Sequence, residues 1–103
     1  MTDTPTNKAT WLDLLTDEDR AFVKRFILNS GSLKAVAQEY GISYPTVRLR
    51  LDRLIQKIHL VDDHTITTDF ELTLRAQHAD GRIDAPTLKK LLDAYREDLE
   101  SRT

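Results

Sequence analysis

The sequence predicts an all-α protein, in which a trihelical helix-turn-helix unit is followed by a C-terminal helical hairpin. Apolar residues recur every three or four positions through most of the chain, which is the spacing of one helix face. Ser, Thr or Asp precedes each such run, and glycines separate several of them, as helix caps and helix ends require. A chain of 103 residues accommodates one small domain, alone or with an appendage.

The N-terminal part predicts a disordered start and one helix. Residues 1–10 are polar, so we expect them to be disordered. Thr10 is expected to cap a short apolar turn at residues 11–15, where Trp11 is either a lid on the core or an exposed anchor for a partner. Thr16 caps the first long helix. The expected buried face of this helix consists of Phe22, Val23, Phe26 and Ile27.

A second helix is predicted over residues 32–40, and a tight turn follows it. Its apolar side consists of Leu33, Val36, Ala37 and Tyr40. Ser32 is the expected N-cap, and with Lys34 and the free N–H groups of the helix start it forms either a phosphate clamp or a simple cap. Gly41 ends the helix because glycine adopts a positive φ without steric cost. Ile42 is expected to fill the angle between the helices.

The third predicted helix is long and basic. Ser43 is a favourable N-cap, and Pro45 falls in the first turn, where its missing N–H costs nothing. The inward stripe consists of Val47, Leu51, Leu54, Ile55 and Ile58. A short helix, a glycine turn and a long basic helix are together typical of a helix-turn-helix that reads the major groove.

The outward face of this helix supplies the candidate DNA contacts. At about 100° per residue, the outward side chains are Pro45, Leu49, Asp52, Arg53 and Gln56, with Arg48 and Arg50 on the flanks. Those expected nearest the base edges are Ser43, Tyr44, Thr46, Arg48 and Leu49. Arginine suits guanine, and leucine suits the thymine methyl group. Phosphate contacts are expected from Lys34, Arg50, Arg53 and Lys57. The alternative is that the basic residues only form a solvated face.

The last third predicts a linker and a helical hairpin. The expected division of the chain is therefore a disordered N-terminus at 1–10, a helix-turn-helix DNA-binding domain at 11–60, and the linker with the hairpin, a possible dimerisation element, at 61–103. Residues 59–67 predict a loop or a small structural hairpin. Thr68 opens a fourth helix, whose candidate packing residues are Phe70, Leu72, Leu74 and Ala76. Asp84 and Pro86 open a fifth helix, whose apolar stripe is Leu88, Leu91, Leu92, Tyr95 and Leu99. That stripe either folds back on the trihelical unit or, as we expect, pairs with a second copy in a homodimer.

The run SGSLKAVAQEYGISYPTVRLRLD resembles the domain-of-unknown-function family 2089, whose members show a G-x-L-K-x-V … G-[IV]-S-Y-P-T-V-R-x-R-L pattern. The matching residues are Gly31, Leu33, Lys34, Val36, Gly41, Ile42, Ser43, Tyr44, Pro45, Thr46, Val47, Arg48, Arg50 and Leu51. The resemblance covers about Leu14 to Leu60 well and the rest loosely, and it implies a transcriptional regulator. Many relatives carry an N-terminal zinc ribbon with paired cysteines. This chain has no cysteine, so no zinc-dependent role follows.

The net charge of −2 conceals an uneven distribution. Between Arg20 and Ile58 there are eight basic and two acidic residues, 8 − 2 = +6, and the remainder has seven and fifteen, 7 − 15 = −8. A locally basic surface is therefore compatible with an acidic chain.

These features separate three classes of function. No nucleophile has an evident base partner and there is no glycine-rich phosphate loop, so we expect neither an enzyme nor a cofactor. The histidines and aspartates at 59–64 match no metal-ligand spacing, and residues 80–84 offer too few oxygens for calcium. No apolar run reaches membrane-spanning length, and the absence of cysteine fits the cytoplasm. The main expectation is a transcriptional regulator that binds double-stranded DNA. The alternative is a module that binds polymerase or sigma factors through Tyr44 and Leu49.

Overall fold

The computed structural model describes residues 10–102, and every regular element in that range is helical. The elements are a 3-10 turn η1 (Trp11–Leu14) and the helices α1 (Asp17–Leu28), α2 (Leu33–Tyr40), α3 (Tyr44–Val61), α4 (Asp69–Ala79) and α5 (Ala85–Ser101). The all-α prediction is confirmed. Residues 59–61, predicted as the start of a loop, are instead the last turn of α3, and the stretch between α3 and α4 is a loop without strands. The predicted disorder of residues 1–9 lies outside the described residues.

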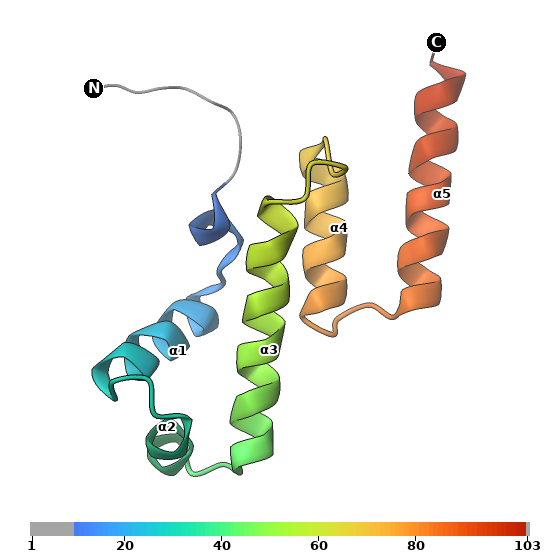
Figure 1. Cartoon of the computed structure of the whole chain (residues 1–103). Helices are drawn as coiled ribbons and strands as arrows, with labels where there is room; N and C mark the ends of the chain where they lie inside the picture. Colours follow the sequence, from blue (N-terminus) through green and yellow to red (C-terminus); the bar gives the residue numbers. More distant parts are fainter. Residues whose placement is uncertain (1–9, 103) are drawn as a thin grey trace, which may run out of the picture.

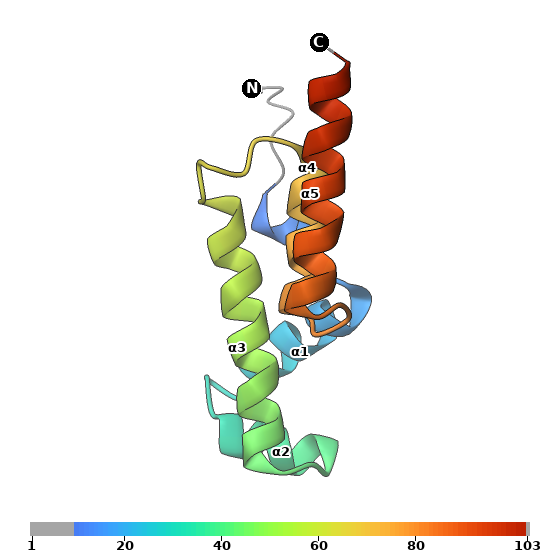
Figure 2. The ribbon, with the colours of Figure 1, turned by 90° about the vertical axis from the view of Figure 1, so that its right-hand side faces the viewer.

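Helix α3 is the central element (Figure 1). Helices α1 and α2 pack against one side of it, α4 packs along its C-terminal half, and α5 packs against α4. The view turned by 90° shows the first turns of α3 extending below the α4–α5 turn (Figure 2). The N-terminal helices therefore form one unit, and the C-terminal hairpin is attached to it through α3.

The helix ends follow local capping chemistry, as the sequence predicts. Each of five N-cap side chains accepts a hydrogen bond from the backbone N–H three residues later; they are Thr16, Ser32, Ser43, Thr68 and Asp84. Gly41 has φ of 67° and ends α2 in the left-handed conformation, and the Ile42 N–H then donates to the Ala37 carbonyl. The angle between α2 and α3 is therefore set by a glycine-dependent turn.

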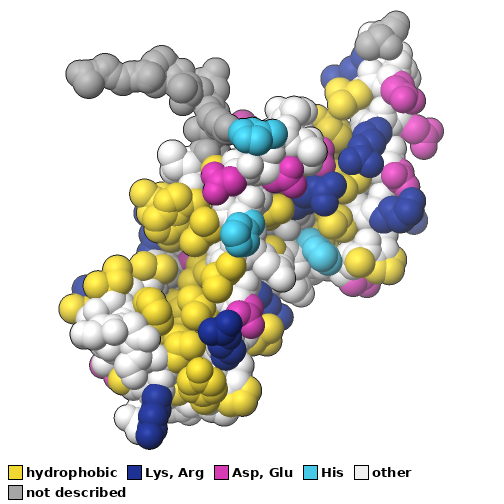
Figure 3. Space-filling model, in the orientation of Figure 1, with side chains coloured by type: hydrophobic (Ala, Val, Ile, Leu, Met, Phe, Trp, Pro, Cys, Tyr) yellow, Lys and Arg dark blue, Asp and Glu magenta, His cyan; other side chains and the backbone are white. Residues whose placement is uncertain are grey.

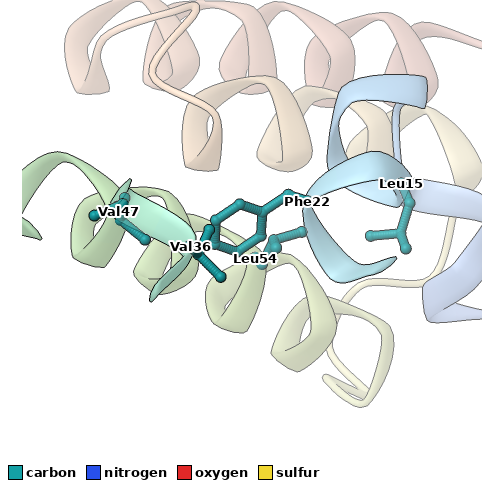
Figure 4. Close-up of a cluster of buried hydrophobic side chains, with 6 residues drawn as sticks. Leu15, Phe22, Val36, Val47 and Leu54 are labelled. Atoms are coloured by element: carbon teal, nitrogen blue, oxygen red, sulfur yellow. The ribbon is translucent and has the colours of Figure 1, made fainter. Parts of the chain in front are cut away.

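The core lies where η1, α1, α2 and α3 meet. It consists of Leu15, Phe22, Val36, Ala37, Val47 and Leu54 (Figure 4). Phe22 is 1% exposed and stacks on Tyr40, with ring centroids 6.4 Å apart. The prediction that Ile27 is buried is wrong, because its side chain is 67% exposed. Ile27 is about 140° around the helix from Phe22, so it points away from the core.

Other predicted packing residues are only partly covered. Trp11 is 38% exposed and Ile42 is 39% exposed, so neither is sealed inside the core. In the hairpin, Leu88 and Leu92 are buried, and Tyr95 contacts Phe70 with ring centroids 4.5 Å apart. The radius of gyration is 16.6 Å, whereas a compact domain of this length has about 13 Å. The outer helix therefore leaves the molecule elongated.

Candidate nucleic-acid interface

The first two turns of α3 form an exposed surface, as the sequence predicts. Tyr44 is 50% exposed and Leu49 is 49% exposed, and Pro45 and Thr46 are also exposed. Basic and hydrophobic side chains lie together on the lower part of the molecule in Figure 3. The start of the helix therefore offers donors and apolar groups to an incoming partner without rearrangement of the core.

Arg48 is the basic residue best placed for a base edge. Its side chain is 52% exposed, and its Nε lies 3.3 Å from Oδ1 of Asp52, one turn later on α3. An exposed ion pair of this kind contributes at most about 1 kcal/mol. Arg48 can therefore exchange Asp52 for a stronger partner at small cost.

The hydroxyl groups at the start of α3 are already engaged in capping. The Ser43 hydroxyl accepts a hydrogen bond from the Thr46 N–H and lies 2.8 Å from the Thr46 hydroxyl. Ser32 is in a similar position at the start of α2, where its Oγ accepts from the Ala35 N–H. Capping is therefore the observed role of both serines. Lys34 is exposed beside Ser32, so a phosphate contact there stays a prediction.

Arg50 is held by α1. Its guanidinium carbon lies 5.7 Å from the centroid of the Phe22 ring, and Nη2 donates to Glu18 Oε1 at 2.9 Å. The side chain is 35% exposed, and its Nε is buried with no hydrogen-bond partner within the described residues. Arg50 therefore stabilises the α1–α3 contact, and a phosphate would have to compete with Glu18 for it.

Arg53 lies where the N-terminal unit meets the C-terminal hairpin. It is exposed and forms no ion pair within residues 10–102. Its guanidinium packs over Gly81 in the α4–α5 turn, so closely that a Cβ built on Gly81 would lie 2.7 Å from Nη2. Arg53 also lines a hollow together with Thr46 and Leu49 of α3. Because the Arg53 side chain is exposed despite this packing, the phosphate contact by Arg53 stays a prediction.

The prediction that Lys57 contacts phosphate is wrong. Its side chain is 1% exposed, and Nζ is enclosed between Asp19 of α1 and Asp80 at the end of α4. The Nζ–Asp80 Oδ2 distance is 3.0 Å. Lys57 lies on the flank of the buried stripe of α3, and α4 covers that flank. Its ammonium therefore cannot reach DNA while the fold is intact.

Asp19 has two structural roles. Its carboxylate accepts hydrogen bonds from the Thr16 N–H and from Lys57. Burial alone would raise the pKa of Asp19, but these hydrogen bonds and the Lys57 charge outweigh it, so the pKa lies below the ordinary value of 3.8. Asp19 is therefore ionised at neutral pH and balances the buried ammonium.

Sequence reasoning missed two residues of this region, Asp80 and Arg82. In the sequence, both residues fall in the stretch 80–84, which is considered only as a calcium site and rejected, yet both line the hollow beside Arg53. No local pattern shows this, because the contact joins segments more than 20 residues apart. No group of acidic or histidine side chains suited to a metal ion occurs within residues 10–102. In the same range, no helix is both long and apolar enough to span a membrane.

The fold and the exposed start of α3 together define a helix-turn-helix protein of the trihelical class. Comparison with protein families agrees, because residues 15–61 match the family described as "Domain of unknown function (DUF2089)-HTH". The chain thus carries a DUF2089-HTH domain that extends from Leu15 in the core to the last residue of α3. No curated protein and no solved structure matches the chain.

Proposed function

We propose that this protein is a DNA-binding transcriptional regulator that inserts the start of α3 into the major groove. The observation that carries the proposal is the exposed N-terminal half of α3, where Arg48, Leu49 and Tyr44 project beyond a short helix and a glycine turn. Helix-turn-helix proteins place the N-terminal part of the second helix of the motif, which is α3 here, against base edges. Lys34 and Arg53, both exposed, are in positions to contact the flanking phosphates.

The proposal includes a homodimer formed through the C-terminal helices. Helix α5 has 17 residues and α4 has 11, so α5 extends beyond the helix that covers it. Phe70, at the start of α4, contacts Tyr95, and Leu99 lies one turn further along α5 and is 41% exposed. A second copy that covers this end would place two reading helices on a two-fold site. Sedimentation over a range of protein concentrations tests this assembly.

Replacing Arg48 tests the reading of bases. A preferred sequence is first enriched from a random duplex library, and affinities for it and for random duplex are then measured. We expect Arg48→Ala to weaken binding to the preferred sequence by about 1–3 kcal/mol more than binding to random DNA, because a bidentate base contact is lost.

The matched control is Lys89→Ala. Lys89 is also an exposed cation, and its Nζ lies 2.8 Å from Oδ2 of Asp93, four residues later on the same helix, but it lies in the first half of α5, away from the proposed dimer end. Lys89→Ala should leave the preference between the two DNAs unchanged. Equal losses on preferred and random DNA for Arg48→Ala would exclude Arg48 as a base-reading residue.

The second candidate function is a protein-interaction module without sequence-specific DNA binding. The exposed side chains Ile42, Tyr44 and Leu49 favour it, because three apolar groups around one turn suit a protein partner such as a polymerase or sigma subunit. A polarisation titration on random duplex at low salt separates the two functions. If the duplex stays unbound at a micromolar concentration of the protein, the interaction module is the favoured function.

A further inference from the structure

The α4–α5 turn brings a second unpaired arginine beside the reading helix. Arg82 is exposed, and it lines the same hollow as Arg53, Thr46 and Leu49 of α3. Neither Arg82 nor Arg53 forms an ion pair within residues 10–102. Two guanidinium groups from separate elements therefore face one open surface.

The carboxylates of this hollow are already engaged. Glu18 accepts from Arg50, whereas Asp19 and Asp80 both accept from the buried Lys57. The hollow thus contains three arginines and three carboxylates, and with Lys57 beneath it the balance is 4 − 3 = +1. Arg53 and Arg82 are the two positive charges without an ion pair, and the cluster of Lys57 with two carboxylates contributes −1, which together give this balance.

The position of the turn is fixed by the fold. Asp80 immediately precedes Gly81 and Arg82, and its carboxylate is bound to the ammonium of Lys57 on α3. Gly81 has φ of 78° and no Cβ, which allows the turn to lie directly against the Arg53 guanidinium. In both ribbon views this turn lies beside the middle of α3, just above the turns that carry the predicted base contacts (Figures 1 and 2).

We propose that Arg82 and Arg53 each bind a backbone phosphate of the DNA that flanks the groove read by α3. The C-terminal hairpin then contributes directly to the DNA interface. Such a contact fixes register and affinity but carries no sequence information. This inference rests on the proposed DNA-binding function.

The test is the salt dependence of binding to random duplex by the full chain. The slope of log K against log salt is negative, and its magnitude decreases by about 0.9 for each contact to a phosphate of B-DNA that is lost. Between 50 and 200 mM salt, the affinity of Arg82→Ala for random duplex should therefore fall by a factor that is roughly three times smaller than the factor for the wild type. Arg82→Lys should keep the wild-type slope, because one positive charge remains at the same position.

Lys90→Ala is the matched control, because Lys90 is an exposed cation of α5 outside the hollow. It should leave the slope unchanged. A wild-type slope in Arg82→Ala, in a protein that binds DNA and responds to Arg48→Ala, overturns this inference alone. Failure of the wild type to bind any duplex overturns the proposed function as well. Equal slope changes for Arg82→Ala and Lys90→Ala would indicate a general charge effect and would also overturn the inference.

Discussion

At the scale of single residues, the two ends of α3 use basic side chains in opposite ways. Arg48, near the start, has only an exposed ion pair, whereas Lys57, in the second half, is enclosed by two carboxylates. A buried ammonium is tolerated only if its charge is compensated and its hydrogen bonds are made. Lys57 is therefore a structural residue that links α1, α3 and α4.

Removal of the Lys57 charge should destabilise the protein strongly. Lys57→Met leaves Asp19 and Asp80 close together without their shared cation, and we expect the free energy of unfolding to fall by about 3–5 kcal/mol. Denaturant unfolding at neutral pH measures this loss. Lys34→Met, at an exposed lysine, is the control and should change the stability by no more than about 0.5 kcal/mol.

The same variant has a pH signature. In the wild type the pKa of Asp19 is below 3.8, so its stabilisation is present above that pH and is lost as the pH falls through the lowered value. In Lys57→Met, burial raises the pKa of Asp19. Protonation of Asp19 in acid then removes the uncompensated buried charge that destabilises the variant. The stability difference between the two proteins should therefore shrink in acid. A constant difference from neutral pH to pH 3 would contradict the assignment of Lys57 as the partner of Asp19.

At the scale of elements, the α2–α3 turn depends on one backbone conformation. Gly41 has φ of 67°, and a Cβ built there would meet no atom within 4 Å. The cost of a side chain is thus conformational and not steric. We expect Gly41→Ala to lower the free energy of unfolding by about 1–2 kcal/mol, and Gly41→Asn to cost less because asparagine adopts the left-handed conformation more readily. Chemical unfolding of both variants checks this order, and equal stability of Gly41→Ala and the wild type would contradict it.

At the scale of the whole molecule, the elongated shape leaves the outer end of α5 without cover. If a second copy covers it, Leu99→Glu should shift the protein from dimer to monomer at concentrations where the wild type is dimeric, because a charge would be buried in the interface. Analytical ultracentrifugation measures the change. Leu28→Glu, at an exposed leucine of α1 (64%), should not affect the assembly. A monomeric wild type at high concentration would rule out the homodimer.

The sequence by itself determined the helical elements, their caps and the glycine turn. It also determined which face of α3 is apolar, except that Ile55 of the predicted inward stripe is 39% exposed. These features depend on residues three or four positions apart, and short-range spacing and capping chemistry are legible in one dimension. The exposure of Tyr44, Arg48 and Leu49 was predicted for the same reason.

Only the tertiary structure decided which flank of α3 the hairpin covers. Periodicity places a residue on a face of its own helix but does not say which other element packs there. Lys57 was therefore predicted as a DNA contact and is buried instead, since α4 and Asp80 close over it. The same packing brings Arg82 beside Arg53. The long-range contact between α3 and the hairpin therefore buries the cation of Lys57 and adds the cation of Arg82 to the surface beside α3.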